Sequence, residues 1–304
     1  MDEAVGRMIT STTKLLGVIG YPIEHSLSPV MHNAALKNLG LDYDYRPFLV
    51  KPEDLETELT GFAAIGLRGF NVTIPHKQAI LPFLSEVSLT AQAVGAVNTV
   101  WRTGNGWAGT NTDVEGFLAP LQTYDYDWSQ TVAVILGNGG AARAVVQGCA
   151  QLRCAEIHVV GRNQLNLETF LNSWANSPLA VKLRVHSQEE LPLLISQANL
   201  LVNTTPIGMH PNVESPLSAA QMANLPLTAV VYDLIYNPNL TQFLRQAQNQ
   251  GNTTINGLEM LVQQGAAALK IWLQQDVPVD IMRQALINKM GKPSPPHSSG
   301  QRQL

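Results

Sequence analysis

Charged side chains are scarce in this sequence. Asp, Glu, Lys and Arg together make up 14% of its 304 residues, whereas about 25% is typical of soluble domains. The formal net charge is −4, and no run of basic residues occurs. These features give no reason to expect a nucleic-acid partner. The polar surface must therefore be supplied largely by Gln, Asn, Ser and Thr.

Cysteines and long apolar runs are also few. The only two cysteines, Cys149 and Cys154, have no further ligands at metal-binding spacing, so we predict no metal site. Reduced thiols in a core are the expectation, as in a cytoplasmic protein. No apolar run approaches the ~18 residues of a membrane span. The first residues are acidic and lack the apolar stretch of a signal peptide, so we expect no membrane contact.

Between two expected tails, residues 1–13 and 291–304, strand patterns alternate with helix patterns. The tails are expected to be disordered, the second because it is rich in Pro, Ser and Gly. The alternation predicts an α/β protein with parallel sheets, with one large or two medium domains. We also expect Ser28 to cap a helix over 29–39, and a helix to begin at Asp113. The expected strands are 15–19, 43–49, 69–73, a pair at 96–102 and 106–109, then 132–136, 157–160, 181–185, 200–203, 229–233 and a short one at 254–255.

The sequence TVAVILGNGGAARA, residues 131–144, combines a buried β run with a glycine-rich turn. Strand 132–136 leads directly into Gly137, Gly139 and Gly140, and a helix of small residues follows. Glycines let a backbone approach phosphates closely, and a helix N-terminus offers free N–H groups. The pattern is typical of a pyrophosphate-binding turn, although an ordinary tight strand–helix turn would look similar.

The end of the next strand distinguishes between nucleotide cofactors. An NAD-binding unit usually carries Asp or Glu about 20 residues after its glycine turn. Here the strand ends in Gly161-Arg162-Asn163. A guanidinium matches a phosphate through two parallel hydrogen bonds. We therefore predict that Arg162 binds the 2′-phosphate of NADP; the alternative is that it is a solvated surface residue.

Four polar clusters precede the glycine turn. Ser26 and Ser28 stand two apart before a helix start, which suits a carboxylate ligand. Lys77 follows the end of a strand, Asn98 ends another, and Asp113 opens a helix. Each has a simpler interpretation, because Ser28 or Asp113 could be only a helix cap and Lys77 only a solvated charge.

Eight segments, spread over residues 14 to about 290, together resemble the shikimate dehydrogenase family. The resemblance implies a Rossmann-type, doubly wound nucleotide-binding domain (118–257) inserted in an α/β substrate domain (14–117 plus 258–290). It also implies an oxidoreductase that reversibly reduces 3-dehydroshikimate to shikimate with NADPH, in chorismate and aromatic amino-acid biosynthesis. In chain order the segments are GYPIEHSLSPVMHNAA, NVTIPHK, VGAVNTV, GTNTDVEGF, ILGNGGAARA, NTTPIGM, YDLIYNP and NGLEMLVQQGA.

The resemblance also implies roles for individual residues, and a protein that is a monomer or a homodimer. Lys77 and Asp113 would form the catalytic pair. The substrate carboxylate would be bound by Ser26 and Ser28, and the rest of the substrate by Thr73, Lys77, Asn98, Asp113, Tyr236 and Gln264. The cofactor would be bound by Gly137, Asn138, Gly139, Gly140, Ala141, Arg162, Asn163, Asn203, Thr204, Thr205, Pro206, Leu234, Tyr236 and Gly257.

One departure from the family pattern concerns the cofactor. The family often has Asn-Arg-Thr and a second basic residue three positions later, whereas this chain has Asn163 and then Asn166. This chain thus has only one of the two basic residues that would bind the 2′-phosphate. We therefore expect NADP to be favoured over NAD less strongly than is usual in the family. A quinate/shikimate dehydrogenase with NAD or mixed cofactor use is therefore an alternative function.

The expected chemistry depends on a coupled Lys77–Asp113 pair. Hydride leaves a secondary alcohol only as the hydroxyl proton is removed, and an ammonium group can stabilise the developing alkoxide or pass the proton. Asp113 would favour the cationic form of Lys77. The presence of both residues argues against another alternative, a non-catalytic module that binds shikimate for regulation.

Overall fold

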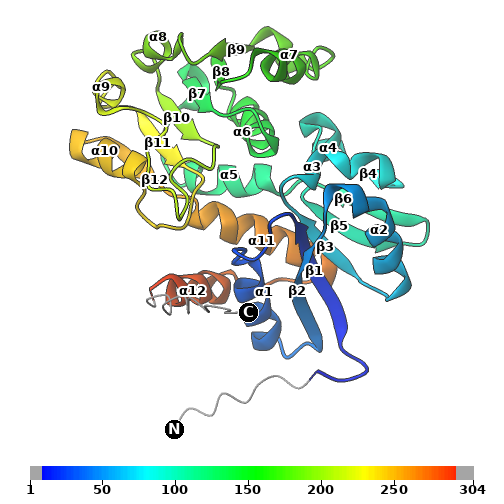
Figure 1. Cartoon of the computed structure of the whole chain (residues 1–304). Coiled ribbons are helices and arrows are strands. Elements are labelled where there is room, and N and C mark those ends of the chain that lie inside the picture. The colour runs from blue at the N-terminus through cyan, green and yellow to red at the C-terminus, as the bar shows by residue number, and fades with distance from the viewer. Residues whose placement is uncertain (1–8, 292–304) are drawn as a thin grey trace, which may run out of the picture.

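The computed structural model describes residues 9–291, which form two six-stranded sheets (Figure 1). In the first sheet β1 (Lys14–Gly20) lies parallel to its neighbours β2 (Tyr43–Leu49) and β3 (Gly69–Val72). The sheet then turns antiparallel through β5 (Thr99–Thr103) and β6 (Gly106–Thr110), and the short β4 (Glu86–Val87) lies at its edge. This sheet is therefore mixed, and β4 was not predicted.

Helices from both ends of the sequence cover the first sheet. On one face α1 (Ser28–Asn38) packs against α11 (Leu258–Leu273) and α12 (Val279–Met290), around a core that includes Leu36 and Leu269. A second core contains Phe62 of α2 (Leu55–Ala64) and Phe70 of β3. The last two helices thus return to the first sheet, where Figure 1 shows them beside α1.

The second sheet is entirely parallel and follows the order β12-β11-β10-β7-β8-β9. Counted from β7 this is the 3-2-1-4-5-6 order of dinucleotide-binding folds, with the switch point between β7 and β10. The predicted doubly wound fold is confirmed. Its strands are β7 (Val132–Leu136), β8 (Glu156–Gly161), β9 (Leu183–Ser187), β10 (Leu200–Asn203), β11 (Val230–Asp233) and β12 (Thr253–Ile255).

Helices lie on both faces of the second sheet, over two separate cores. One core includes side chains of α6 (Gly140–Gln151) and α7 (Gln164–Asn172). The other includes side chains of α8 (Leu191–Ile195), α9 (Ala219–Met222) and α10 (Gln242–Gln250). Near-continuous apolar strands, such as β7 and β10, are expected where both faces are covered.

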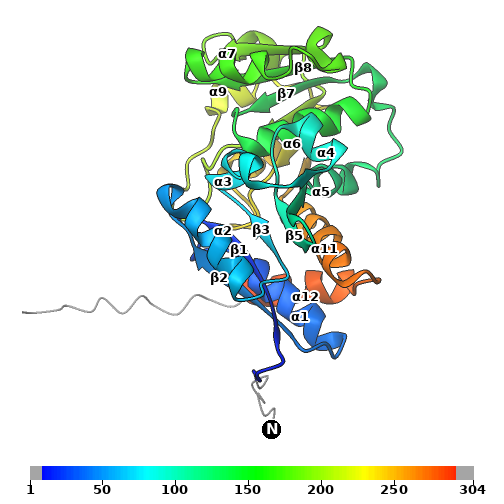
Figure 2. The ribbon, with the colours of Figure 1, turned by 90° about the vertical axis from the view of Figure 1, so that its right-hand side faces the viewer.

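Helix α5 (Asp113–Leu121) joins the two halves of the molecule, and Figure 2 shows it between α6 and α11. Its contact with α11 is close at Gly116, where a Cβ atom would lie 2.6 Å from the Met260 carbonyl oxygen. On its other side Phe117 packs against Gly148 of α6 and stacks on Tyr232, with 5.3 Å between ring centroids. The helix therefore contacts rigid elements on both sides.

The predicted cap at Ser28 is wrong, whereas the predicted start of a helix at Asp113 is confirmed. Helix α1 includes Ser28, and Leu27 stands at its N-cap without any side-chain cap bond. The Ser28 hydroxyl instead meets the hydroxyl of Tyr45, a tertiary partner that local sequence does not reveal. At α5 the N-cap is Thr112, so Asp113 is the first helical residue and its carboxylate is free to face the site.

Other expectations concern the cysteines, the tails and the helices. Cys149 and Cys154 are free and buried, as predicted. Residues 1–8 and 292–304 of the expected tails lie outside the described residues, while Thr12 and Thr13 donate to Asp42 at 2.8 Å each. Within 9–291 no helix is long and apolar enough to cross a membrane, and no cluster of three or more His, Cys, Asp or Glu could hold a metal.

Candidate active site

Lys77 and Asp113 meet at the junction of the two halves. Lys77 lies on α3 (His76–Ala79), a short helix that follows β3, and its carbonyl accepts a hydrogen bond from Val97 N–H at 2.7 Å. The Lys77 Nζ and Asp113 Oδ2 atoms are 2.5 Å apart, and the two side chains are 16% and 7% exposed. A partly shielded ion pair of this kind is stronger than a surface pair. The two residues that sequence analysis paired are thus in contact.

Two asparagines hold Asp113, one through its carboxylate and the other through its backbone. Asn98 is buried and its Nδ2 donates to Asp113 Oδ1 at 2.8 Å and to Gln264 Oε1 at 3.3 Å. Asn111 Oδ1 accepts from the Asp113 N–H at 3.0 Å, while Asn111 Nδ2 donates to a backbone carbonyl. One carboxylate oxygen therefore faces Asn98 and the other faces Lys77. Asn111 was not predicted, although an Asn two residues before a helix start is a known sign of such a turn.

The serine pair lies at the start of α1, beyond the end of β1. Ser26 Oγ accepts from the Ser28 N–H at 3.3 Å, and Ser28 is 8% exposed. Thr73 follows β3 and packs so closely on Gly20 that a Cβ there would lie 2.6 Å from its methyl group. Tyr236, which follows β11 of the second sheet, contacts this segment, because its hydroxyl accepts a hydrogen bond from the Leu27 backbone. Burial raises the pKa of the Tyr236 hydroxyl, and this hydrogen bond opposes the rise.

The glycine turn forms an open cradle at the switch point between β7 and β10. Gly137 has a φ of +103°, and a Cβ there would lie 2.7 Å from Thr204 Oγ1, so only glycine fits. Gly139 faces open space, and α6 begins with no side-chain cap and no acidic residue in its first turn. A helix N-terminus of this kind suits a pyrophosphate, so these residues fit a dinucleotide.

The cradle lies next to the catalytic pair. A Cβ on Gly140 would lie 3.3 Å from Cδ of Lys77, which places the lysine stem against the start of α6. The glycine turn of one half and Lys77 of the other are therefore adjacent. A ligand in the cradle would extend towards the Lys77–Asp113 pair.

Residues at the end of β8 form the edge of the cofactor region. Arg162 is exposed, and no hydrogen bond or ion pair to it is found within 9–291. Asn163 caps α7, because its side chain accepts from the Asn166 N–H at 2.9 Å. Asn138 lies near Gly161, where a Cβ would be 3.5 Å from its Cγ. The guanidinium of Arg162 is thus available to a ligand, while the Asn163 side chain already has a structural partner.

The loop after β10 is held from inside the protein. The Asn203 side chain is fully buried: its Nδ2 donates to Asp233 Oδ1 at 3.0 Å and its Oδ1 accepts from both the N–H and the hydroxyl of Thr205. It therefore orients the loop containing Thr204 and Pro206, and its own polar atoms are occupied. Sequence analysis did not identify Asp233, because an Asp at a strand end does not indicate which distant residues it will form hydrogen bonds with.

Gly257 lies directly against the strand end that carries Leu234. A Cβ on Gly257 would be 2.0 Å from the Leu234 carbonyl oxygen, and the Gly257 N–H donates to Ile235 at 3.0 Å. Any side chain would push apart the segment leading to Tyr236 and the start of α11. Gly257 is thus needed for the close approach of these two segments.

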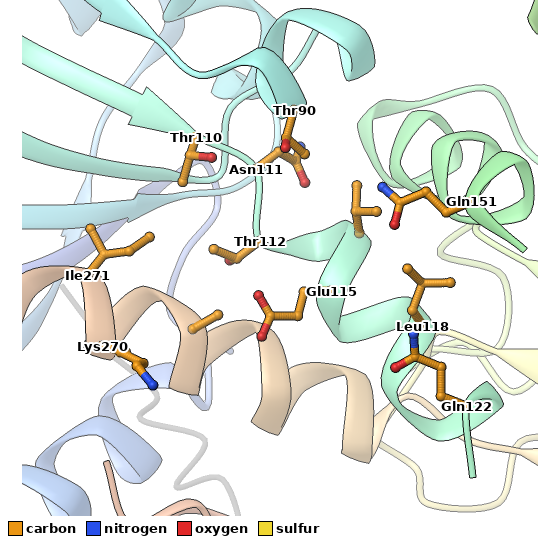
Figure 3. Close-up of a pocket in the computed structure, with 12 residues that line it drawn as sticks. Thr90, Thr110, Asn111, Thr112, Glu115, Leu118, Gln122, Gln151, Lys270 and Ile271 are labelled. Atoms are coloured by element: carbon orange, nitrogen blue, oxygen red, sulfur yellow. The ribbon is translucent and has the colours of Figure 1, made fainter. Parts of the chain in front are cut away.

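A separate cavity of about 530 Å³ lies beside α5, between α4 (Leu89–Val94), α6 and α11 (Figure 3). Figure 3 shows Glu115 of α5, Gln122 directly after α5, Lys270 of α11 and Gln151 of α6 around it. None of the predicted site residues lines this cavity. The cavity is lined by Asn111 and Thr112, next to Asp113 in the chain, but not by Lys77 or Asp113 themselves.

A dinucleotide-binding sheet with an anion cradle next to a buried Lys–Asp pair defines a nicotinamide-dinucleotide-dependent oxidoreductase. Two family models match this chain: the shikimate dehydrogenase substrate binding domain over residues 18–100, and the shikimate 5'-dehydrogenase C-terminal domain over 257–287. The chain is 67% identical over 287 residues to the shikimate dehydrogenase (NADP(+)) of Nostoc sp., covering 93% of this chain and 99% of that protein. The chain belongs to the shikimate dehydrogenase family.

Solved structures agree with this assignment. A crystal structure of a shikimate dehydrogenase in complex with NADP+ has a TM-score of 0.86 and 39% identity, covering 95% of this chain and 99% of that one. The Thermus thermophilus enzyme in complex with NADP(H) and shikimate has a TM-score of 0.79 and 34% identity, covering 90% and 99%. The resemblance of the eight sequence segments is confirmed.

Proposed function

We propose that this protein is an NADP-dependent shikimate dehydrogenase, which reversibly reduces 3-dehydroshikimate to shikimate in chorismate and aromatic amino-acid biosynthesis. The observation that carries the proposal is the contact of Lys77 with both Asp113 and the start of α6 at Gly140. In a chain of this family, that contact puts the proton-transfer groups beside the dinucleotide cradle. We assign the substrate domain to 14–117 plus 258–290, and the cofactor domain to 118–257.

The substrate is held between the serine pair and the catalytic pair. Ser26 and Ser28 donate hydrogen bonds to its carboxylate, next to the positive end of α1. Thr73, Asn98 and Gln264 bind its hydroxyl groups, and Tyr236 closes over it from the second domain. The polar contacts of Asn98 with Asp113 and Gln264 support this assignment, because they place three of these side chains in one cluster.

Proton transfer is the part of the reaction performed by the chain itself. NADP, when bound, supplies the hydride acceptor or donor. During oxidation, charge develops on the substrate oxygen as the hydroxyl proton leaves, and the Lys77 ammonium stabilises that charge. Lys77 Nζ accepts the substrate proton as it passes one of its own to Asp113 Oδ2, so the pair gains one proton in total. During reduction the same proton returns to the carbonyl oxygen.

The cofactor is held along the switch point of the second sheet. Its pyrophosphate accepts hydrogen bonds from the free N–H groups of the turn formed by Gly137, Asn138, Gly139, Gly140 and Ala141. Arg162, next to Asn163, binds the 2′-phosphate. The loop of Asn203, Thr204, Thr205 and Pro206 lies on the ribose side, and Leu234, Tyr236 and Gly257 line the nicotinamide end. We also propose that the enzyme acts in the cytoplasm as a monomer or homodimer, which its reduced cysteines support.

The first experiment follows absorbance at 340 nm with shikimate, supplying NADP+ and NAD+ separately. We expect fast reduction of NADP+, and we expect Lys77→Ala to lower kcat by about 10²- to 10⁴-fold because it removes the proton-transfer group. Lys37→Ala is the matched control, since Lys37 is an exposed lysine on α1. A Lys77→Ala variant with near-normal kcat would contradict the proposed role of the pair.

The same assay separates the alternatives. Comparable rates with NAD+ and NADP+ would show that Arg162 alone does not select NADP, and turnover of quinate would then favour a quinate/shikimate dehydrogenase. Folded protein that binds shikimate but turns over neither cofactor would point to the non-catalytic module. If the protein turns over NADP+, Arg162→Ala should raise the KM for NADP+ and leave that for NAD+ nearly unchanged.

A further inference from the structure

A buried polar layer lies beneath the proposed substrate site, and Tyr45 of β2 is at its centre. The Tyr45 side chain is fully buried, and its ring stacks on His32 of α1 with 4.2 Å between centroids and 12° between planes. Burial lowers the pKa of His32 to about 3, so this imidazole is neutral at working pH. The neutral stack holds the Tyr45 ring in one orientation.

The Tyr45 hydroxyl joins two residues from different elements. It donates to Asn71 Oδ1 of β3 at 2.7 Å, and it meets the Ser28 hydroxyl at the start of α1. Burial raises the pKa of Tyr45 well above its ordinary value, so the group stays protonated and remains a donor. The hydroxyl therefore fixes the orientation of the Asn71 amide and lies next to the Ser28 hydroxyl.

The layer continues from Asn71 to the catalytic pair. Asn71 Nδ2 donates to the Asn98 carbonyl and to Thr99 Oγ1, both at 3.1 Å. Thr99 Oγ1 in turn donates to Asn98 Oδ1 at 2.9 Å, and Asn98 Nδ2 reaches Asp113 at 2.8 Å. Asn71 and Asn98 are 6% and 2% exposed, and Thr99 is fully buried, so water does not substitute for these contacts.

We propose that Tyr45 is a positioning residue that couples the carboxylate-binding Ser28 to the Asn98 amide that holds Asp113. The inference rests on the proposed function, because it concerns how that substrate is held. Tyr45 contacts no reacting atom; it acts through Ser28 on one side and through Asn71 on the other. Without its hydroxyl, Asn71 Oδ1 loses the 2.7 Å hydrogen bond from Tyr45, and the Ser28 hydroxyl loses a neighbour.

The test compares Tyr45→Phe with Tyr43→Phe in steady-state assays of the full-length protein. Tyr43→Phe is a matched control on the same strand. Within residues 9–291 the Tyr43 hydroxyl makes no hydrogen bond, and the substitution keeps the ring that faces Lys14. We expect Tyr45→Phe to raise the KM for shikimate about tenfold, the factor for one lost buried hydrogen bond, with less than twofold change in the KM for NADP+. Tyr43→Phe should leave both KM values unchanged.

A double-mutant cycle tests the coupling itself. If Tyr45 acts through Ser28, then adding Tyr45→Phe to Ser28→Ala should raise the shikimate KM by clearly less than it does in the wild-type background. Equal effects in both backgrounds, or a Tyr45→Phe enzyme with wild-type KM, would overturn the proposal. If Tyr45→Phe does not fold, Thr99→Val interrupts the same layer, and the same rise in shikimate KM is expected.

The assay of the wild-type protein distinguishes a failure of this inference from a failure of the proposed function. If wild-type protein does not turn over shikimate, the proposed activity fails, and calorimetric titration with shikimate then supplies dissociation constants for the same comparison of variants. If wild-type protein is active and Tyr45→Phe behaves like Tyr43→Phe, only the role of Tyr45 fails.

Discussion

At the scale of single residues, Asp233 is a buried carboxylate that ties together two loops of the cofactor region. It is fully buried at the end of β11 and accepts hydrogen bonds from Asn203, from the Thr241 hydroxyl at 2.6 Å and from the Ile235 N–H. Burial raises its pKa from 3.8 to about 6, although these three donors oppose the rise. The loop that carries Thr205 depends on this carboxylate through Asn203.

A pH-dependent contribution to stability follows from Asp233. Because its pKa is raised in the folded protein, the stabilisation is complete below about pH 4 and is lost as pH rises through about 6. We predict that wild type loses about 3 kcal/mol relative to Asp233→Asn between pH 4 and pH 7.5, which is the value of about two pKa units. Urea unfolding at several pH values measures this difference. Asp54→Asn, at an exposed carboxylate, is the control, and parallel pH profiles for wild type and Asp233→Asn would disprove the prediction.

At the scale of elements, the packing of α5 on α11 positions the catalytic cluster. Asp113 begins α5 and Gln264 lies on α11, and both meet Asn98. The two helices touch at Gly116, where a Cβ atom would approach the Met260 carbonyl oxygen to 2.6 Å and Gln264 Cβ to 2.9 Å. Two of the three atoms nearest this position belong to the backbone of α11. These atoms can move away only if the two helices separate.

Two glycine substitutions test this packing. We predict that Gly116→Ala lowers the free energy of unfolding by about 1–3 kcal/mol, because an overpacked contact forces the backbone to shift. It should also lower kcat/KM, since Asp113 and Gln264 would move apart. Gly61→Ala in α2 meets nothing within 4 Å, and we expect it to stabilise the protein by about 0.4–1 kcal/mol. Thermal and urea unfolding would decide; equal effects at the two sites would contradict the packing argument.

Local sequence predicted the elements that carry local patterns. The glycine turn, the strand before it and the helix of α5 are found where periodicity and glycine spacing placed them, because those patterns reflect nearby backbone geometry. The hydrogen bonds from Tyr45 to Asn71 and from Asn203 to Asp233 join residues 26 and 30 positions apart. No local pattern encodes such contacts, and for the same reason Ser28 was wrongly predicted to be a cap.

At the scale of the whole molecule, Arg143 links the two domains. It lies on α6, directly after the glycine turn, yet its guanidinium points away from the cradle and is 6% exposed. Its Nη1 donates to the Val94 carbonyl of α4 at 2.9 Å, and its Nη2 donates to Ser173 at 2.6 Å. The rings of Phe170 and Trp174 lie 5.1 and 5.7 Å from the guanidinium carbon. Gly95, with a φ of +67°, leaves room for it.

We expect this link to set the distance between the glycine turn and Lys77, the proposed catalytic lysine. Arg143 and Gly140 share α6, while Val94 lies shortly before Val97, whose N–H holds the carbonyl of Lys77. Interfaces between domains otherwise allow relative motion. A misplacement of about 1 Å can lower a reaction rate about 10²-fold. The orientation of α6 relative to Lys77 should therefore control kcat more than it controls binding of the cofactor.

Arg143→Met tests that argument, because it keeps much of the apolar stem and removes both hydrogen bonds. We predict a fall in kcat of at least about tenfold, consistent with a shift of a fraction of an ångström. The dissociation constant for NADPH, measured by fluorescence titration, should change far less, since the cradle itself is intact. Arg245→Met, at an exposed arginine on α10, is the control. If Arg143→Met weakened NADPH binding as strongly as it lowered kcat, Arg143 would act on the cradle itself and not on the alignment of the two domains.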